Sequence, residues 1–123
     1  MEDWLQNFVD DVGNDLSPLH QAVEISDLEE LTRVLDAGAD PDEIHEYSGW
    51  TPLLRAIDGE LDGSVQTGNS LGAAATAVLL AYGADPERPS RDGLTPMHLA
   101  FQTRHEMAVR LLEAHIARRR AAG

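Results

Sequence analysis

The side chains most able to take part in catalysis or metal binding are the five histidines and 22 carboxylates of this chain. Histidine and carboxylate side chains held close together can bind a metal ion or transfer protons. His45 stands between Glu43 and Glu46, and His105 and His115 lie near the C-terminal end. None of these histidines forms a His-x-x-x-His pair or another metal-ligand spacing, and the chain contains no cysteine. The sequence therefore predicts no metal site, no disulfide and no catalytic histidine.

Serines, glycines and carboxylate pairs give no clearer sign of catalysis. Ser17, Ser48, Ser70 and Ser90 lack the context of a nucleophile elbow, and no glycine-rich phosphate loop is present. A carboxylate pair can be assembled in many ways from so many acids, but nothing in the sequence marks one pair out. We expect no catalytic residue and no cofactor, and we expect that the chain is not an enzyme.

Charge is distributed unevenly along the chain. Residues 1–62 contain 17 of the acidic residues and two arginines, whereas residues 63–123 contain five acids and seven arginines, and the whole chain has a net charge of −13. An acidic surface attracts basic proteins and repels nucleic acid. We therefore expect a basic protein as the partner and no nucleic-acid partner. The alternative is that the acids only keep a small protein soluble.

Composition also bears on source and location. All nine basic residues are arginine, and arginine codons are GC-rich, which weakly favours a high-GC bacterial source. No apolar run approaches membrane-spanning length, and the acidic N-terminus is the reverse of a signal peptide. We expect a cytoplasmic protein that does not bind membranes and is a monomer when free.

One tetrapeptide occurs three times, which indicates an internal repeat. It reads Ser-Pro-Leu-His at 17–20, Thr-Pro-Leu-Leu at 51–54 and Thr-Pro-Met-His at 95–98. Gly-Ala-Asp-Pro follows the first two copies, at 38–41 and 83–86. The prolines are spaced by 34 and then 44 residues, and the excess falls inside the second unit. Without that insertion the period is about 33 residues, a length typical of stacked helical repeats.

The residues of each unit predict two helices and a loop. The Ser or Thr of the tetrapeptide suits a helix N-cap, and the proline after it suits the first helical position. A second helix follows, and Gly38 or Gly83 ends it in a left-handed conformation. Such a unit cannot bury its apolar face alone, so the units must stack.

The tetrapeptide, the period of about 33 residues and the glycine that ends the second helix together resemble the ankyrin repeat over about residues 15 to 117. The resemblance implies an all-α solenoid of three helix-turn-helix repeats. We assign repeat 1 to residues 15–47, repeat 2 to 48–91 and repeat 3 with a C-terminal cap to 92–123. Residues 1–14 form an amphipathic N-terminal capping helix, or alternatively a helix that docks on a partner.

The resemblance also implies a working surface and a structural role for two histidines. Ankyrin-like proteins bind partners through the hairpin tips and the exposed concave side of the first helices. His20 and His98 take the place of a histidine that bridges the capping hydroxyl and the neighbouring loop backbone. Trp50 is the main anchor candidate, with packing against the next loop as the alternative. The residues predicted to contact a partner are Glu24, Asp42, Glu43, Glu46, Tyr47, Trp50, Arg55, Asp58, Arg91, Asp92, Leu94 and Gln102.

The insertion at about residues 59–71 is the largest departure from the family pattern. Its polar composition is typical of a flexible loop, and the alternative is a second contact element. Taken together, the sequence predicts a non-catalytic protein-binding module. The most specific hypothesis is an inhibitor of the immunity or antitoxin type, which covers a basic toxin or effector with an acidic concave surface. The alternative is a general ankyrin adaptor or a regulatory subunit of an unrelated bacterial protein.

Overall fold

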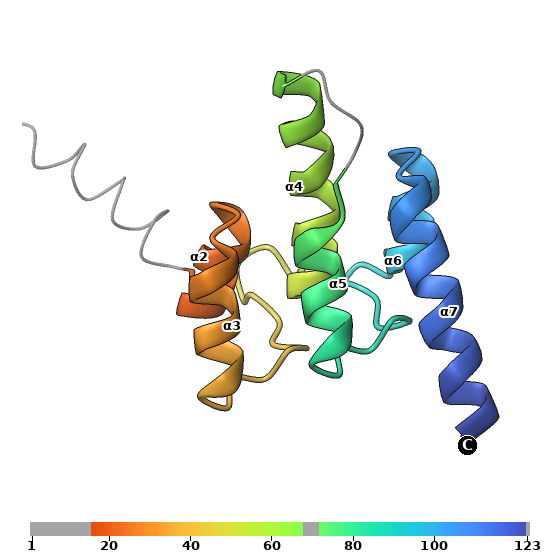
Figure 1. The fold of residues 1–123 in the computed structure, drawn as a ribbon, viewed down its shortest axis with the longest axis horizontal. Coiled ribbons are helices and arrows are strands. Elements are labelled where there is room, and N and C mark those ends of the chain that lie inside the picture. The colour runs from red at the N-terminus through yellow and green to blue at the C-terminus, as the bar shows by residue number, and fades with distance from the viewer. Residues whose placement is uncertain (1–15, 68–71, 123) are drawn as a thin grey trace, which may run out of the picture.

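A computed structural model of the chain describes residues 16–67 and 72–122. This part contains six helices and no strand, so the expected all-α class is confirmed (Figure 1). The helices are α2 (Pro18–Glu24), α3 (Leu28–Asp36), α4 (Pro52–Thr67), α5 (Ala74–Ala81), α6 (Pro96–Gln102) and α7 (Glu106–Ala122). The expected N-terminal capping helix lies outside the described residues.

The repeated tetrapeptide starts three of these helices. The hydroxyl oxygens of Ser17, Thr51 and Thr95 each accept a hydrogen bond from the backbone N–H three residues later, at 3.3, 3.2 and 3.1 Å. A side-chain acceptor at this position satisfies one of the N–H groups that a helix start leaves unpaired. Gly38 and Gly83 have φ values of +106° and +97°, so the predicted left-handed helix terminators are also confirmed.

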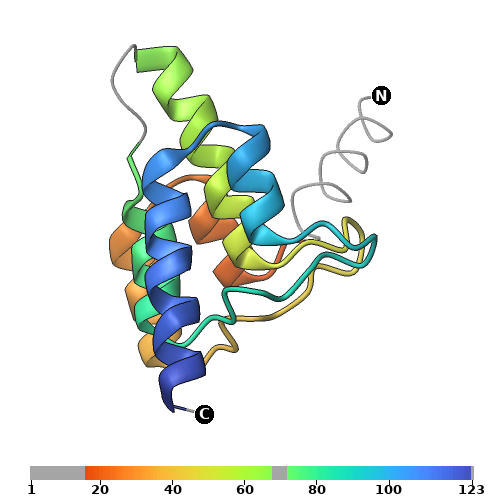
Figure 2. The ribbon, with the colours of Figure 1, turned by 90° about the vertical axis from the view of Figure 1, so that its right-hand side faces the viewer.

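The helices form two layers that repeat along the chain. The inner helices α2, α4 and α6 contact one another in order, and the outer helices α3, α5 and α7 do the same (Figure 1). Each outer helix also packs on the inner helix that precedes it in sequence. The two long loops that join the units project side by side from the edge of the inner layer (Figure 2). Buried leucine, isoleucine, valine and alanine side chains fill the space between the layers, and the three-repeat solenoid is confirmed.

The predicted loop in the second unit is wrong for most of its length. Helix α4 continues through the start of the insertion to Thr67. Glycine in a helix interior costs about 1 kcal/mol, and this helical stretch contains two, Gly59 and Gly63. Contacts of Glu60, which lies inside the insertion, oppose that cost.

Glu60 joins the second repeat to the third. Its Oε1 lies 2.7 Å from Nε2 of His105 and accepts from the Thr76 hydroxyl at 2.8 Å. Its Oε2 accepts from the Thr76 backbone N–H at 3.1 Å. Helix α5 has Ala73 as N-cap and no capping bond of its own, so Glu60 supplies that acceptor from α4. His105 is fully buried and in turn caps α7, because its Nδ1 accepts from Ala108 N–H at 3.3 Å.

Candidate protein-binding surface

Arg55 is the centre of a polar cluster between the first two repeats. Its Nε donates to Nδ1 of His20 at 3.1 Å, and a terminal nitrogen of its guanidinium donates to Glu24 Oε2 at 2.8 Å. The other terminal nitrogen lies 3.3 Å from the Ser48 hydroxyl. The Arg55 side chain is only 16% exposed. The expectation that Arg55 faces outward to a partner is therefore wrong, since its guanidinium is used to fasten α2, α4 and the first loop together.

His20 completes this cluster in the neutral form. Its Nε2 donates to the Glu43 carbonyl oxygen at 2.8 Å, so Nδ1 is free to accept from Arg55. Burial lowers the pKa of His20, and the nearby positive charge of Arg55 acts in the same direction, against the opposing effect of the Glu43 bond. The predicted bridge from His20 to the neighbouring loop backbone is confirmed. His98 makes no such ring contact within the described residues, because its side chain is exposed in the last repeat.

Hydrogen bonds join the tips of the two long loops to each other. The Arg91 backbone N–H donates to the Gly49 carbonyl oxygen at 2.9 Å, and the Arg91 guanidinium donates to the Glu46 carbonyl oxygen. Gly49 has φ of +74°, and a Cβ at this residue would lie 2.8 Å from Cβ of Arg91. Both facts require glycine there. Beside these bonds, the residue Tyr47 is 84% exposed and has one tilted ring contact, with His45 at 6.4 Å.

Several predicted contact residues serve the fold instead. Trp50 and Leu94 occupy matching places in the two loops, and both are half-buried against the hydrophobic core. Trp50 thus packs on the core rather than on the next loop, and its role as a partner anchor stays a prediction. The outward position expected for Leu94 is wrong. The Asp42 carboxylate accepts from the Asp85 backbone N–H at 2.8 Å, so it joins the two loops near their base.

The remaining predicted residues separate into an accessible group and a less accessible one. Glu43 and Asp58 are half-buried, and Gln102 is exposed at the end of α6. Five other predicted residues are exposed, and Arg55 bonds to one of them while Arg91 bonds to the backbone of another. We call these five residues the hairpin surface: Glu24, Glu46, Tyr47, Arg91 and Asp92. Its negative charge is reduced by Arg55 under Glu24 and by Arg91 between the tips. The net negative charge of the hairpin surface is therefore smaller than its three carboxylates alone would give.

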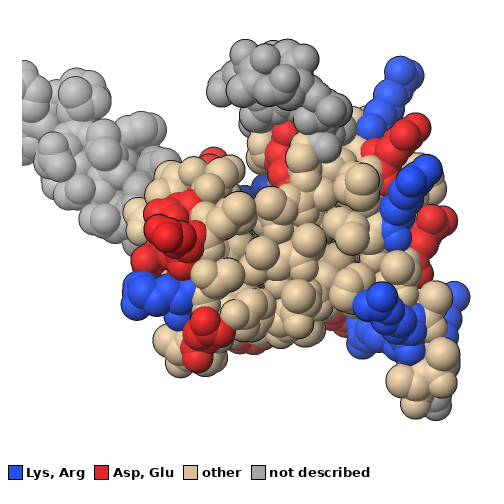
Figure 3. All heavy atoms as spheres, in the orientation of Figure 1, with Lys and Arg blue, Asp and Glu red and all other residues tan. Residues whose placement is uncertain are grey.

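The outer face of the stack differs from the hairpin surface. Figure 3 shows charged side chains toward its two ends, over α3 and α7, and an uncharged middle over α5. Helix α5 contains no charged residue, and its neighbour Tyr82 donates through its hydroxyl to the Asp36 carboxylate at 2.5 Å.

Features of other functional classes are weak in the described part. Residues 16–67 and 72–122 contain no group of three or more histidine or acidic side chains able to bind a metal ion. None of their helices is both long and apolar enough to cross a membrane. Residues 68–72 read Gly-Asn-Ser-Leu-Gly, the letters of a nucleophile elbow. That motif requires a strand before the serine, and here helix α4 precedes it.

Sequence reasoning missed the polar ties between repeats. His105 stands at the N-cap of α7 just as Asp27 does at the N-cap of α3, where its Oδ1 accepts from Glu30 N–H at 3.1 Å. Comparing the units position by position would have revealed this role for His105. The partner of His105 is Glu60, which lies inside the insertion and has no counterpart in the other units, so no such comparison would have found it.

Known proteins share this architecture. A sequence profile described as "Ankyrin repeats (3 copies)" matches residues 19–120. The human ARF GTPase-activating protein GIT1 is 38% identical over 103 residues, which are 82% of this chain and 12% of that protein. The mouse 2-5A-dependent ribonuclease is 35% identical over 89 residues, which are 72% of this chain and 11% of that protein. The chain thus spans about an eighth of the curated relatives that it matches.

Solved structures agree with the sequence matches. An ankyrin repeat domain from Acinetobacter baumannii superimposes with a TM-score of 0.67 at 29% identity, over 79% of this chain and 46% of that chain. The ankyrin repeat domain of Bcl-3, a member of the IkappaB protein family, gives 0.69 at 26% identity, over 81% and 39%. The profile covers most of the chain. The chain belongs to the ankyrin repeat family.

Proposed function

We propose that this chain is a non-catalytic module that binds another protein through the hairpin surface. The observation that carries the proposal is Tyr47. This residue is 84% exposed at a loop tip that backbone and side-chain hydrogen bonds hold in place. Tyrosine on a rigid support is among the residues that contribute most to protein interfaces, because little conformational entropy is lost when it is buried.

The charge around Tyr47 supports a basic partner. Glu46 and Asp92 flank the tips with exposed carboxylates, and the first half of the chain carries most of the acids. Opposite charge speeds the encounter of two proteins and selects among partners. The finer proposal is that the partner is a basic toxin or effector, and that the carboxylates occupy its cationic binding site and thereby inhibit it.

Affinity capture with matched variants tests this proposal. The tagged chain is used to capture proteins from its host, and binding to each purified candidate is then measured by calorimetry. Glu46→Arg should weaken binding at least about tenfold, because it opposes a basic partner at the tip. Glu29→Arg makes the same charge change on α3, where the side chain is exposed, and should leave binding nearly unchanged. Equal effects of the two variants would mean that only total charge matters, and would contradict the proposal that the hairpin surface binds the partner.

The alternative function is that of an adaptor or regulatory subunit. It is favoured by two observations: the relatives match this chain over a small part of their length, and the outer face has an uncharged middle over α5. An adaptor that binds through apolar contacts should keep its association rate as ionic strength rises. Binding steered by charge should lose rate steeply over the same range.

A further inference from the structure

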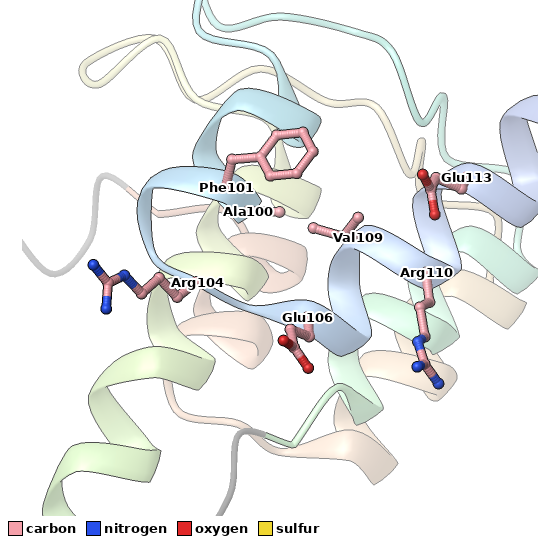
Figure 4. Close-up of a pocket in the computed structure, with 7 residues that line it drawn as sticks. All are labelled: Ala100, Phe101, Arg104, Glu106, Val109, Arg110 and Glu113. Carbon is pink, nitrogen blue, oxygen red and sulfur yellow. The ribbon is translucent and has the colours of Figure 1, made fainter.

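The stack ends in a face that nothing covers within the described residues. Helices α6 and α7 form this face, and Figure 2 looks directly onto it. It contains a groove of 490 Å³ between the two helices, lined by Ala100, Phe101, Arg104, Glu106, Val109, Arg110 and Glu113. Phe101 and Val109 lie in the middle of the groove, with Arg104 on one side and Arg110 and Glu113 on the other (Figure 4). We call this surface the end face.

Phe101 shows that the end face resembles the surfaces buried between repeats. It stands three residues after the last residue of its tetrapeptide, and the same position in the other units holds Val23 and Ile57. Those two side chains are 3% and 0% exposed, because each is covered inside the stack. Phe101 is 63% exposed. An exposed aromatic at a position that stacking normally buries is a candidate contact site.

The charges of the end face have no partner within the described part of the chain. Arg104, Glu106, Arg110 and Glu113 form no hydrogen bond or ion pair through their side chains there. They comprise two cations and two anions, so the end face is locally neutral on a protein with a net charge of −13. Two copies of so acidic a chain repel each other over most of their surface, and a neutral face is where contact between them costs least.

The order of these charges is self-complementary. If two copies of α7 run antiparallel with their centre at residue 108, Glu106 of each copy lies opposite Arg110 of the other. Val109 then lies near the two-fold axis, beside Phe101. A two-fold contact must use one surface twice in this way.

We propose that the end face is an interface between two copies of this chain, which associate as a two-fold dimer with their hairpin surfaces both free. The occupant of the groove is the Phe101 side chain and α7 of the second copy. In this proposal the free chain is a dimer, where the sequence led us to expect a monomer. Such a dimer presents two partner-binding surfaces, which would raise apparent affinity for any partner that has two sites.

Sedimentation velocity over a concentration series tests the proposal. The full chain should shift from monomer to dimer and stop there, because a two-fold contact closes. Phe101→Glu should remain a monomer at every concentration. Tyr47→Glu removes another exposed aromatic with the same charge change, and it should dimerise like the unaltered chain. Circular dichroism melting checks that each variant is folded.

Charge reversal tests the pairing itself. Glu106→Arg and Arg110→Glu should each weaken dimerisation roughly tenfold or more, since each substitution acts twice in a two-fold contact. The double variant restores opposite charges across the interface and keeps the net charge, so it should recover dimerisation. The proposal is overturned if the chain stays monomeric up to about 1 mM, or if larger assemblies form. A dimer that survives Phe101→Glu, or a double variant no better than the single ones, would also overturn it.

Discussion

Replacing Arg55 with alanine tests the most consequential difference between the sequence-based expectation and the structure. The substitution removes the donor to buried Nδ1 of His20, and leaving a buried polar group without a partner costs about 1–3 kcal/mol. The ion pair with Glu24 adds little, at most about 0.5 kcal/mol, because that carboxylate is 53% exposed and screened by solvent. We therefore expect the free energy of unfolding to fall by about 2–3 kcal/mol, which corresponds to a loss of about 10 °C in the melting temperature.

Urea denaturation followed by circular dichroism measures this change, and Arg33→Ala is the matched control. Arg33 lies on α3 with a 68% exposed side chain and pairs with Glu30 alone. Its removal should barely move the denaturation midpoint. If Arg55→Ala is as mild as Arg33→Ala, the assignment of Arg55 as a tie between repeats is wrong. Loss of partner binding in that folded variant would then restore Arg55 to the contact surface.

Three further changes test the ties between and within the repeats. Glu60→Ala should lower the free energy of unfolding by about 3 kcal/mol, because buried His105 loses its acceptor; a loss no larger than that of an exposed Glu29→Ala would contradict this. Ser26 has φ of +59°, so Ser26→Gly should raise stability by about 0.5 kcal/mol, whereas Gly at neighbouring Ile25, with φ of −93°, should lower it. Burial lowers the pKa of His20 in the folded chain, so protonation of His20 favours the unfolded chain. The stability that neutral His20 contributes is therefore complete above a pH of about 6.5 and is lost as the pH falls below that value. Melting temperatures between neutral and mildly acidic pH should show a shallower fall in His20→Gln, and identical slopes would refute the assignment.

The fold could be predicted from the sequence because residues at the helix ends of each repeat mark where its helices begin and end. Ser17, Thr51 and Thr95 are N-cap residues followed by proline, and Gly38 and Gly83 are the terminators that the structure shows. These signals are local, so they need no knowledge of the neighbouring chain. Their recurrence at one period then fixes the stacking.

The site was predicted less well because exposure depends on contacts between loops. Trp50 and Tyr47 are both large aromatics of one loop, and nothing local shows that Trp50 packs on the core while Tyr47 is exposed. Arg55 looked exposed because it replaces an apolar residue on a helix. Its actual partners lie 31 and 35 residues away in sequence, at Glu24 and His20. Glu60 is a second example, since it contacts His105 and Thr76 far along the sequence and lies in a helix where a loop was predicted.

The measurement that tests the central claim most directly is the association rate of the captured partner as ionic strength rises, for the unaltered chain and for two aromatic variants. The rate should fall steeply with salt. Tyr47→Ala should weaken binding by about 2 kcal/mol, the scale of an interface hot spot, with an unchanged melting temperature. Trp50→Ala should instead lower the melting temperature, because Trp50 packs against the core. A salt-independent rate together with full binding by Tyr47→Ala would contradict the claim that the hairpin surface binds a basic protein.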